Sequence, residues 1–283
     1  MINGTLIKDT FSGRDLFIYL PPSYRNGTKR YPALYVQDRG DVFDPAYTSS
    51  LSAIEKLFSN RDIPELLLIG VASEDRESEY TPFSAPHLIK PDHMYGGQGA
   101  LYADFLANEL KPYIDRHYQT DPSRESTGII GKSFGGLISI YTGYRASETF
   151  GKIGSLSGSF WFPGMIEWMR SQYFKNANLR IYMDVGSTEG TDRSNLQKEM
   201  IPRTKEAYRI LQESAAFRKD LTFVLDEGGA HRLERFADRF PEAVKWLFGS
   251  CQNNAQNDRS LSNRAVMMKK RKEKNNGNPE SFG

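Results

Sequence analysis

The chain has 283 residues, of which 39% are hydrophobic and 25% are charged, and its formal net charge is +2 at pH 7. This length and composition predict one sizeable hydrophobic core in a single domain of about 250 residues, a size that is ordinary for an α/β enzyme. The one cysteine, Cys251, excludes an internal disulfide and a cluster of thiolate metal ligands.

Polar side chains interrupt the first twenty residues, whose longest apolar run, Leu16–Leu20, is followed directly by two prolines. A run of that length suits a strand and is too short for a signal peptide or a membrane span. We therefore expect a cytoplasmic protein. We also expect residues 11–20 to supply antiparallel strands at the edge of a sheet.

Five later apolar runs of strand length alternate with stretches typical of helices. They are Ala33–Gln37, Leu66–Ala72, Gly128–Gly131, Leu179–Val185 and Leu221–Leu225. Apolar residues spaced by three and four from Leu101 to Ile114 predict a helix that Pro112 kinks near its end. This alternation predicts an α/β fold with a mostly parallel central sheet and helices on both faces.

The segment from Gly158 to Asn178 is unusually rich in aromatic residues. It is either a lid over a pocket or a helical insert packed in the ordinary way. Phe160 and Trp161 are its candidates for a pocket wall, because ligand pockets are lined mainly by apolar and aromatic side chains.

The composition changes after residue 250. Residues 251–283 are rich in Asn and Gln, contain the basic run Met267–Lys274, and carry a net charge of +4 that leaves −2 for the rest. Such a segment buries too little apolar surface to offset its ordering entropy. We predict a domain over residues 1–250 and a basic, disordered tail over 251–283. A contact of the tail with nucleic acid or an anionic membrane is the alternative.

A serine lies between glycines directly after the third of the five apolar runs. Gly131, Ser133 and Gly135 form a G-x-S-x-G pattern with a strand signal before it and a helical stretch after it. In such an elbow the chain turns sharply from strand to helix and exposes the serine as a nucleophile. Ser133 is therefore the predicted nucleophile.

The serine requires a base, and the chain has only four histidines. His117 lies at the charged end of a helix, and His87 and His93 lie in a proline-rich loop. His231 follows the last predicted strand and precedes an apolar-periodic helix. Because open α/β sheets gather functional loops at the carboxyl ends of their strands, His231 is the predicted base.

The acid that orients the base is expected between the two in sequence. The loop after Leu179–Val185 contains Glu189, the favoured acid, and Asp192, the alternative. Asp184 is expected to point into the strand, and Asp226 lies only five residues before His231.

Acyl transfer also requires N–H groups that bind the developing oxyanion. Phe134 supplies one by its position directly after the nucleophile. The second is expected from the loop after Ala33–Gln37, at Arg39 or Gly40.

From Leu16 to Phe248 the chain resembles the esterase branch of the α/β-hydrolases, which includes enterochelin esterases, feruloyl esterases and S-formylglutathione hydrolases. The segments that carry the resemblance are Tyr19–Tyr24, Arg30–Tyr35, Glu109–Ile114, Gly131–Gly136 and Ser155–Trp161. The resemblance implies the α/β-hydrolase fold. The chain departs from it at Arg39, where the family has a glycine after the aspartate.

Lys132–Leu137 and Ser157–Trp161 are most similar to the enterochelin and bacillibactin esterases, which open the trilactones of catecholate siderophores. Arg76 and Glu79 match a pair found there. Because ferric catecholates are anionic, Lys132, Arg76 and Arg39 are expected to contact the substrate, with Phe160 and Trp161 beside them.

We therefore predict a serine esterase that forms an acyl-enzyme, acts on a small-molecule ester and requires no metal or organic cofactor. A siderophore trilactone is the preferred substrate; a feruloyl or other aryl ester and an S-formylglutathione-type thioester remain alternatives. A catalytically silent scaffold used for binding is the rival from another class. No specific nucleic-acid or membrane partner is expected, and the oligomeric state is not predicted.

Overall fold

The computed structural model describes residues 2–25, 28–90, 92–176, 178–214 and 220–250. The predicted tail, residues 251–283, lies outside the described residues, as does Cys251.

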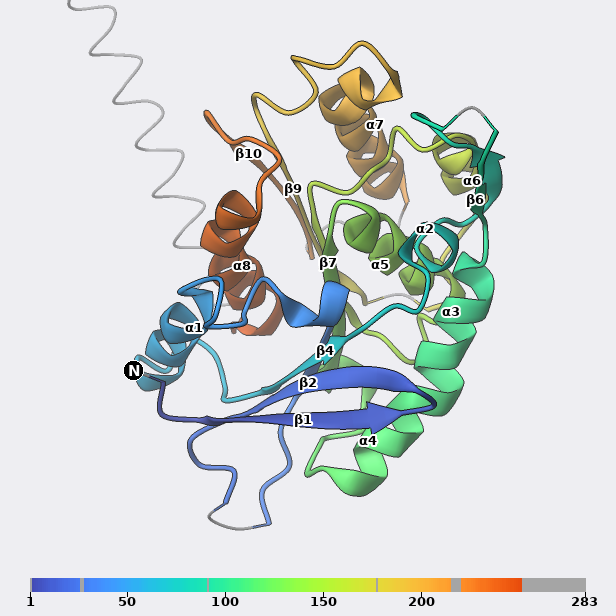
Figure 1. The fold of residues 1–283 in the computed structure, drawn as a ribbon. Coiled ribbons are helices and arrows are strands. Elements are labelled where there is room, and N and C mark those ends of the chain that lie inside the picture. The colour runs from blue at the N-terminus through green and yellow to red at the C-terminus, as the bar shows by residue number, and fades with distance from the viewer. Residues whose placement is uncertain (1, 26–27, 91, 177, 215–219, 251–283) are drawn as a thin grey trace, which may run out of the picture.

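The centre of the fold is an eight-stranded sheet with the strand order β1-β2-β4-β3-β7-β8-β9-β10 (Figure 1). The first two strands join it by antiparallel pairing, and all later neighbours pair in parallel. The bounds are β1 Thr5–Phe11, β2 Arg14–Leu20, β3 Ala33–Val36, β4 Leu67–Val71, β7 Thr127–Lys132, β8 Lys152–Leu156, β9 Arg180–Gly186 and β10 Leu221–Asp226. The predicted parallel sheet and its antiparallel edge are thus confirmed.

Helices cover both faces of this sheet (Figure 1). On one face lie α1 and α8, and on the other lie α3 to α7. The bounds are α1 Ser50–Ser59, α2 Arg76–Glu79, α3 Gly99–Phe105, α4 Lys111–His117, α5 Phe134–Arg145, α6 Met165–Ser171, α7 Met200–Glu213 and α8 Leu233–Phe248. None of the helices in the described ranges combines the length and the apolar character that crossing a membrane requires.

Strands inside the sheet carry apolar residues on both faces, because a core covers each face of the sheet. In β2, Leu16, Ile18 and Leu20 belong to the larger core under α3 to α7, and Phe17 and Tyr19 belong to the smaller core under α1 and α8. Successive side chains of a strand point to opposite faces. A strand buried on both sides therefore reads as a continuous apolar run.

Two elements differ from expectation. The predicted helix from Leu101 to Ile114 is interrupted by a π-helical turn, η2 (Leu106–Leu110), directly before α4. Pro112 has no N–H and its ring crowds the carbonyl four residues earlier, so a widened turn there accommodates it. The strand β8 was not anticipated, because Lys152–Leu156 is short and contains a glycine.

The aromatic segment after β8 is mainly core. Phe160 and Phe162 are fully buried, and α6 packs against the larger core through Met165 and Met169. Smaller elements complete the fold: β5 (Ser84–Pro86) pairs with β6 (Met94–Gly96), and η1 (Asp38–Gly40), η3 (Arg124–Ser126) and η4 (Leu196–Glu199) are short 3-10 turns.

Candidate active site

Ser133 occupies a sharp turn between β7 and α5. Its φ of 56° and ψ of −124° are strained for a residue with a side chain. A Cβ atom at Gly131 would lie 2.5 Å from the carbonyl carbon of Gly135, and one at Gly135 would lie 3.0 Å from the Cβ of Gln37. Glycines are therefore required on both sides of the serine, because the backbone approaches itself there.

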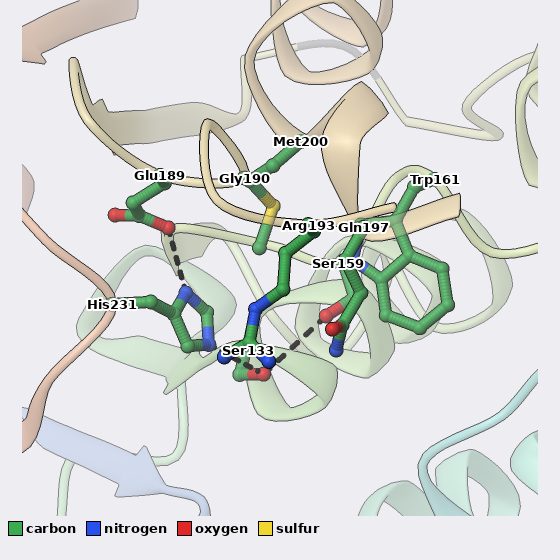
Figure 2. A pocket seen from close by; sticks show the side chains of 9 residues that line it. All are labelled: Ser133, Ser159, Trp161, Glu189, Gly190, Arg193, Gln197, Met200 and His231. Atoms are coloured by element: carbon green, nitrogen blue, oxygen red, sulfur yellow. Dashed lines mark hydrogen bonds and ion pairs between the residues drawn. The ribbon is translucent and has the colours of Figure 1, made fainter. Parts of the chain in front are cut away.

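Ser133, His231 and Glu189 come together at the carboxyl ends of three strands. His231 Nε2 lies 3.0 Å from Ser133 Oγ, and His231 Nδ1 lies 2.6 Å from Glu189 Oε2 (Figure 2). The Glu189 side chain is fully buried, whereas the His231 side chain is 35% exposed. These contacts from serine to histidine to glutamate have the hydrogen-bonding geometry of a catalytic triad.

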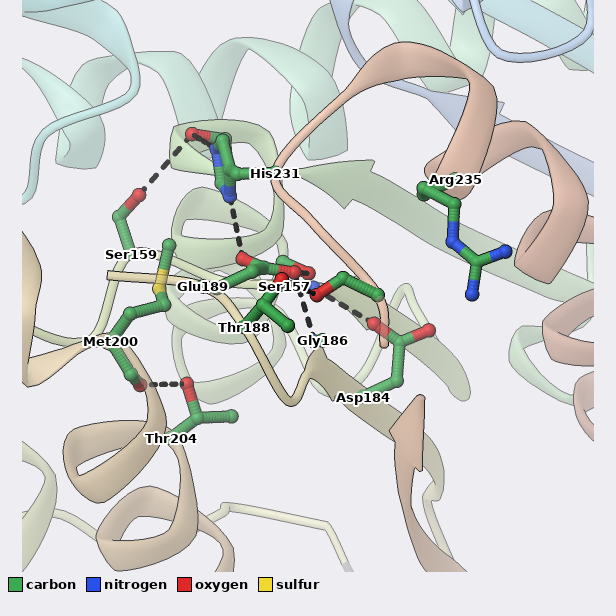
Figure 3. Close-up of polar contacts among 12 residues, drawn as sticks. Ser157, Ser159, Asp184, Gly186, Thr188, Glu189, Met200, Thr204, His231 and Arg235 are labelled. Carbon is green, nitrogen blue, oxygen red and sulfur yellow. Dashed lines mark hydrogen bonds and ion pairs between the residues drawn. The ribbon is translucent and has the colours of Figure 1, made fainter. Parts of the chain in front are cut away.

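Glu189 is held from behind through its second carboxylate oxygen. Ser157 Oγ donates to Glu189 Oε1 at 2.5 Å, and the Gly186 N–H donates to the same oxygen at 2.9 Å (Figure 3). Burial alone disfavours the ionised acid, but the contact with His231 and these two donors hold the pKa of Glu189 below its ordinary value. The carboxylate is therefore ionised and fixed.

A buried arginine extends this support to a second carboxylate. Arg239 of α8 donates to Ser157 Oγ and to Asp184 Oδ1, each at 2.9 Å. Complete burial raises the pKa of Asp184 to about 7, although the guanidinium of Arg239 favours its ionised form. Ser157 has a φ of 46°, a left-handed conformation that side chains rarely adopt.

The candidate oxyanion donors are backbone N–H groups directly after Ser133 and in the turn after β3. Phe134 is the first residue of α5, so its N–H has no carbonyl partner within the helix. In the turn after β3, the N–H of Gly40 donates to Gln37 O at 3.1 Å and that of Asp38 to Tyr80 Oη at 3.0 Å. The Gly40 N–H thus already has an acceptor, the Gln37 carbonyl. Within the described part of the chain, the Arg39 N–H donates to no backbone carbonyl.

The predicted anion contacts Lys132 and Arg76 are instead paired with carboxylates of the chain. Lys132 Nζ lies 3.0 Å from both Asp38 and Asp41, and Arg76 Nε lies 2.6 Å from Asp38. Although burial opposes it, the two cations hold the pKa of Asp38 below its usual value. These ion pairs tie the turn after β3 to the end of β7, directly before Ser133.

The pocket above Ser133 is lined by both polar and apolar residues. It opens to solvent, and its space together with that opening is about 320 Å³. The residues lining it are Ser133, Ser159, Trp161, Glu189, Gly190, Arg193, Gln197, Met200 and His231 (Figure 2). Of the predicted substrate contacts, only Trp161 is among them. Phe160 is 1% exposed and packs in the core, and the Arg39 side chain lines a separate depression beside β1 and β2.

Besides Gly190, which has no side chain, four pocket residues were not predicted from the sequence. Ser159 Oγ lies 3.4 Å from Ser133 Oγ, and Arg193, Gln197 and Met200 follow Glu189 in the chain. Ser159 lies within the segment Ser155–Trp161 that the resemblance had singled out. The other three carry no motif, and only their position after the predicted acid could have drawn attention to them.

The alternative acids and bases lie elsewhere. The Asp192 side chain is 78% exposed and faces Arg193, and Asp226 pairs with Arg235. His117 Nδ1 donates to the Tyr113 carbonyl, and His87 faces Glu77. Within the described ranges, no three His, Cys, Asp or Glu side chains are placed to hold a metal ion.

Known proteins resemble this chain in sequence and in fold. YbbA of Bacillus subtilis, an uncharacterized protein, is 33% identical over 248 residues, covering 88% of this chain and 98% of that protein. The iron(III) enterobactin esterase of Escherichia coli K12 is 31% identical over 98 residues, 31% of this chain and 24% of that one. An IroE-like serine hydrolase from Shewanella oneidensis superposes with a TM-score of 0.71 at 20% identity, over 87% of this chain and 80% of that one.

The family assignment follows from the extent of a further match. Residues 10–247, from β1 to the last turn of α8, match the family described as "Putative esterase". Its fold is that of the α/β-hydrolases, as predicted. The chain belongs to this esterase family.

Proposed function

We propose that this protein is a serine ester hydrolase that works through an acyl-enzyme. The observation that carries the proposal is the continuous contact from Ser133 through His231 to Glu189. Ser133 Oγ attacks the ester carbonyl carbon while His231 Nε2 takes its proton and then passes it to the departing alcohol. Water attacks the acyl-enzyme in the second step, again losing its proton to His231, and Ser133 regains its hydrogen.

The developing oxyanion is bound by two backbone N–H groups. We assign these to Phe134, at the amino end of α5, and to Arg39, because the Gly40 N–H already donates to Gln37. Oxyanion donors lower the barrier because they are oriented before the charge forms. The ion pairs of Asp38 with Lys132 and Arg76 hold the Arg39 turn in place.

The preferred substrate is a siderophore trilactone of the enterobactin or bacillibactin type. Support comes from the esterase family and from the segment shared with the iron(III) enterobactin esterase. A feruloyl or other aryl ester is the second candidate, because Trp161 gives the pocket an aromatic wall. An S-formylglutathione-type thioester is the third.

A fluorophosphonate probe tests the nucleophile. We expect wild-type protein to be labelled at Ser133, with the modified peptide identified by mass spectrometry, and Ser133→Ala to remain unlabelled. Ser139→Ala is the matched control, since its buried hydroxyl lies in α5, away from His231. A folded wild-type protein that is not labelled and hydrolyses no ester would support the silent binding scaffold instead.

The substrate is tested by comparing kcat/KM for iron-bound and iron-free siderophore trilactones, methyl ferulate, S-formylglutathione and 4-nitrophenyl acetate. We expect the trilactones to be preferred. A preference for the small acetate equal to that for the trilactones would contradict the siderophore assignment and leave the esterase assignment intact.

A further inference from the structure

The pocket over Ser133 contains an arginine that no resemblance assigns to it. Arg193 lies on the loop between Glu189 and α7, and Figure 2 shows its side chain extending from that loop toward Ser133. The Arg193 side chain is 54% exposed, so its guanidinium is open to solvent and to a bound molecule.

The charge of Arg193 is only weakly compensated by the protein. Among the described residues its ion-pair partner is Asp192, whose Oδ1 lies 3.6 Å from Arg193 Nε and whose side chain is 78% exposed. An ion pair so exposed contributes little, because water screens both charges. Lys132 and Arg76 differ from it, since each lies within 3.0 Å of a carboxylate that is 9% exposed.

The residues around Arg193 favour an aromatic or short apolar group that carries an anionic oxygen. Gln197 also lines the pocket, and its side-chain amide supplies a second donor. Trp161 and Met200 supply apolar surface. Guanidinium binds carboxylates and phenolates well because its donors form a planar fork.

We propose that Arg193 and Gln197 form a subsite for an anionic oxygen of the ester substrate, a carboxylate or a phenolate, within reach of Ser133. The proposal rests on the esterase function and adds to it the charge of the preferred substrate. Asp192 partly neutralises the subsite when it is empty, and the substrate anion displaces it.

The test compares matched esters that differ in charge. For wild type, Arg193→Gln and Arg193→Lys, kcat/KM is measured on neutral 4-nitrophenyl butyrate, on 4-nitrophenyl hemisuccinate, charged in the acyl part, and on 2-carboxyphenyl acetate, charged in the alcohol part. Arg209→Gln is the control, because Arg209 is an exposed arginine of α7 outside the pocket. It removes the same charge without touching the subsite.

We expect Arg193→Gln to lower the preference for an anionic over the neutral ester about tenfold, a change of about 1.4 kcal/mol in transition-state binding. Arg193→Lys should retain part of this preference, and Arg209→Gln all of it. Asp192→Asn should strengthen the preference, because it removes the competing carboxylate. Equal losses on neutral and anionic esters in Arg193→Gln would overturn the proposal.

A binding measurement separates this proposal from the esterase function. Ligand-observed NMR compares benzoate with the isosteric neutral benzamide on wild type, Arg193→Gln and Arg209→Gln. We expect benzoate to bind more tightly than benzamide, and Arg193→Gln alone to abolish the difference. If benzoate binds no more tightly than benzamide to the wild-type protein, the subsite proposal is wrong even where ester hydrolysis is intact. If the protein hydrolyses no ester but still binds benzoate more tightly through Arg193, the subsite proposal holds and the esterase proposal is wrong.

Discussion

Replacing Ser157 tests whether the buried network behind Glu189 serves to orient the catalytic acid. The Ser157 hydroxyl donates to Glu189 Oε1 at 2.5 Å and accepts from Arg239 at 2.9 Å. Its removal leaves Glu189 Oε1 with the Gly186 N–H as its remaining close donor. The carboxylate then gains rotational freedom. His231, which is hydrogen-bonded to it, becomes less precisely aligned.

The expected magnitudes follow from these contacts. A hydrogen bond to a charged group contributes about 1.5–3 kcal/mol, and the hydroxyl makes two, so Ser157→Ala should lower the free energy of unfolding by about 3–6 kcal/mol. Ser157→Gly removes the same hydroxyl but avoids the left-handed strain of about 1–2 kcal/mol. After the added entropy of the unfolded glycine chain, it should be about 1 kcal/mol more stable than Ser157→Ala.

Both variants should lower kcat by about tenfold, because His231 is less precisely aligned. A tenfold loss corresponds to about 1.4 kcal/mol in the activation free energy, which is much less than the loss expected on removing a triad residue. Urea unfolding and kcat on 4-nitrophenyl butyrate are measured together. Ser147→Ala is the control, since its buried hydroxyl accepts the Asn176 N–H far from Glu189 in the fold. A folded Ser157→Gly protein with wild-type kcat would show that the hydroxyl does not hold the acid.

Two further predictions concern buried carboxylates. The folded-state pKa of Asp184, about 7, lies above its value in the unfolded chain, so the folded state binds the extra proton and stability falls as pH rises from about 4 to 7. In Asp184→Asn this decline in stability, measured by thermal unfolding across that pH range, should be smaller. An unchanged slope would contradict the raised pKa of Asp184. Asp38→Asn should lower stability by about 3 kcal/mol at pH 7, because it leaves Arg76 and Lys132 without their shared carboxylate. Because the pKa of Asp38 is lowered in the folded state, its contribution to stability is present above the unfolded-state pKa and is lost as pH falls through the lower folded-state value. The free energies of unfolding of wild type and Asp38→Asn should therefore converge at acid pH. Asp62→Asn, at an ion pair remote from the site, is the control.

The sequence by itself predicted most of the strands and the elbow at Ser133, because both depend on local patterns. Continuous apolar runs such as Ala33–Val36 identify strands buried on two faces, and β8 escaped notice because its run is short and interrupted by glycine. Gly131 and Gly135 mark the elbow at Ser133 since the turn leaves no room for a Cβ.

The tertiary structure decided what each charged side chain does. In sequence, Lys132 and Arg76 look like contacts for an anion, yet folding brings Asp38 to both of them. Arg193 has no motif, yet the loop that carries Glu189 turns it into the pocket. Ser157 and Arg239 are 82 residues apart in the chain and meet behind the acid. Charge pairing depends on distance in space, which a local pattern does not encode.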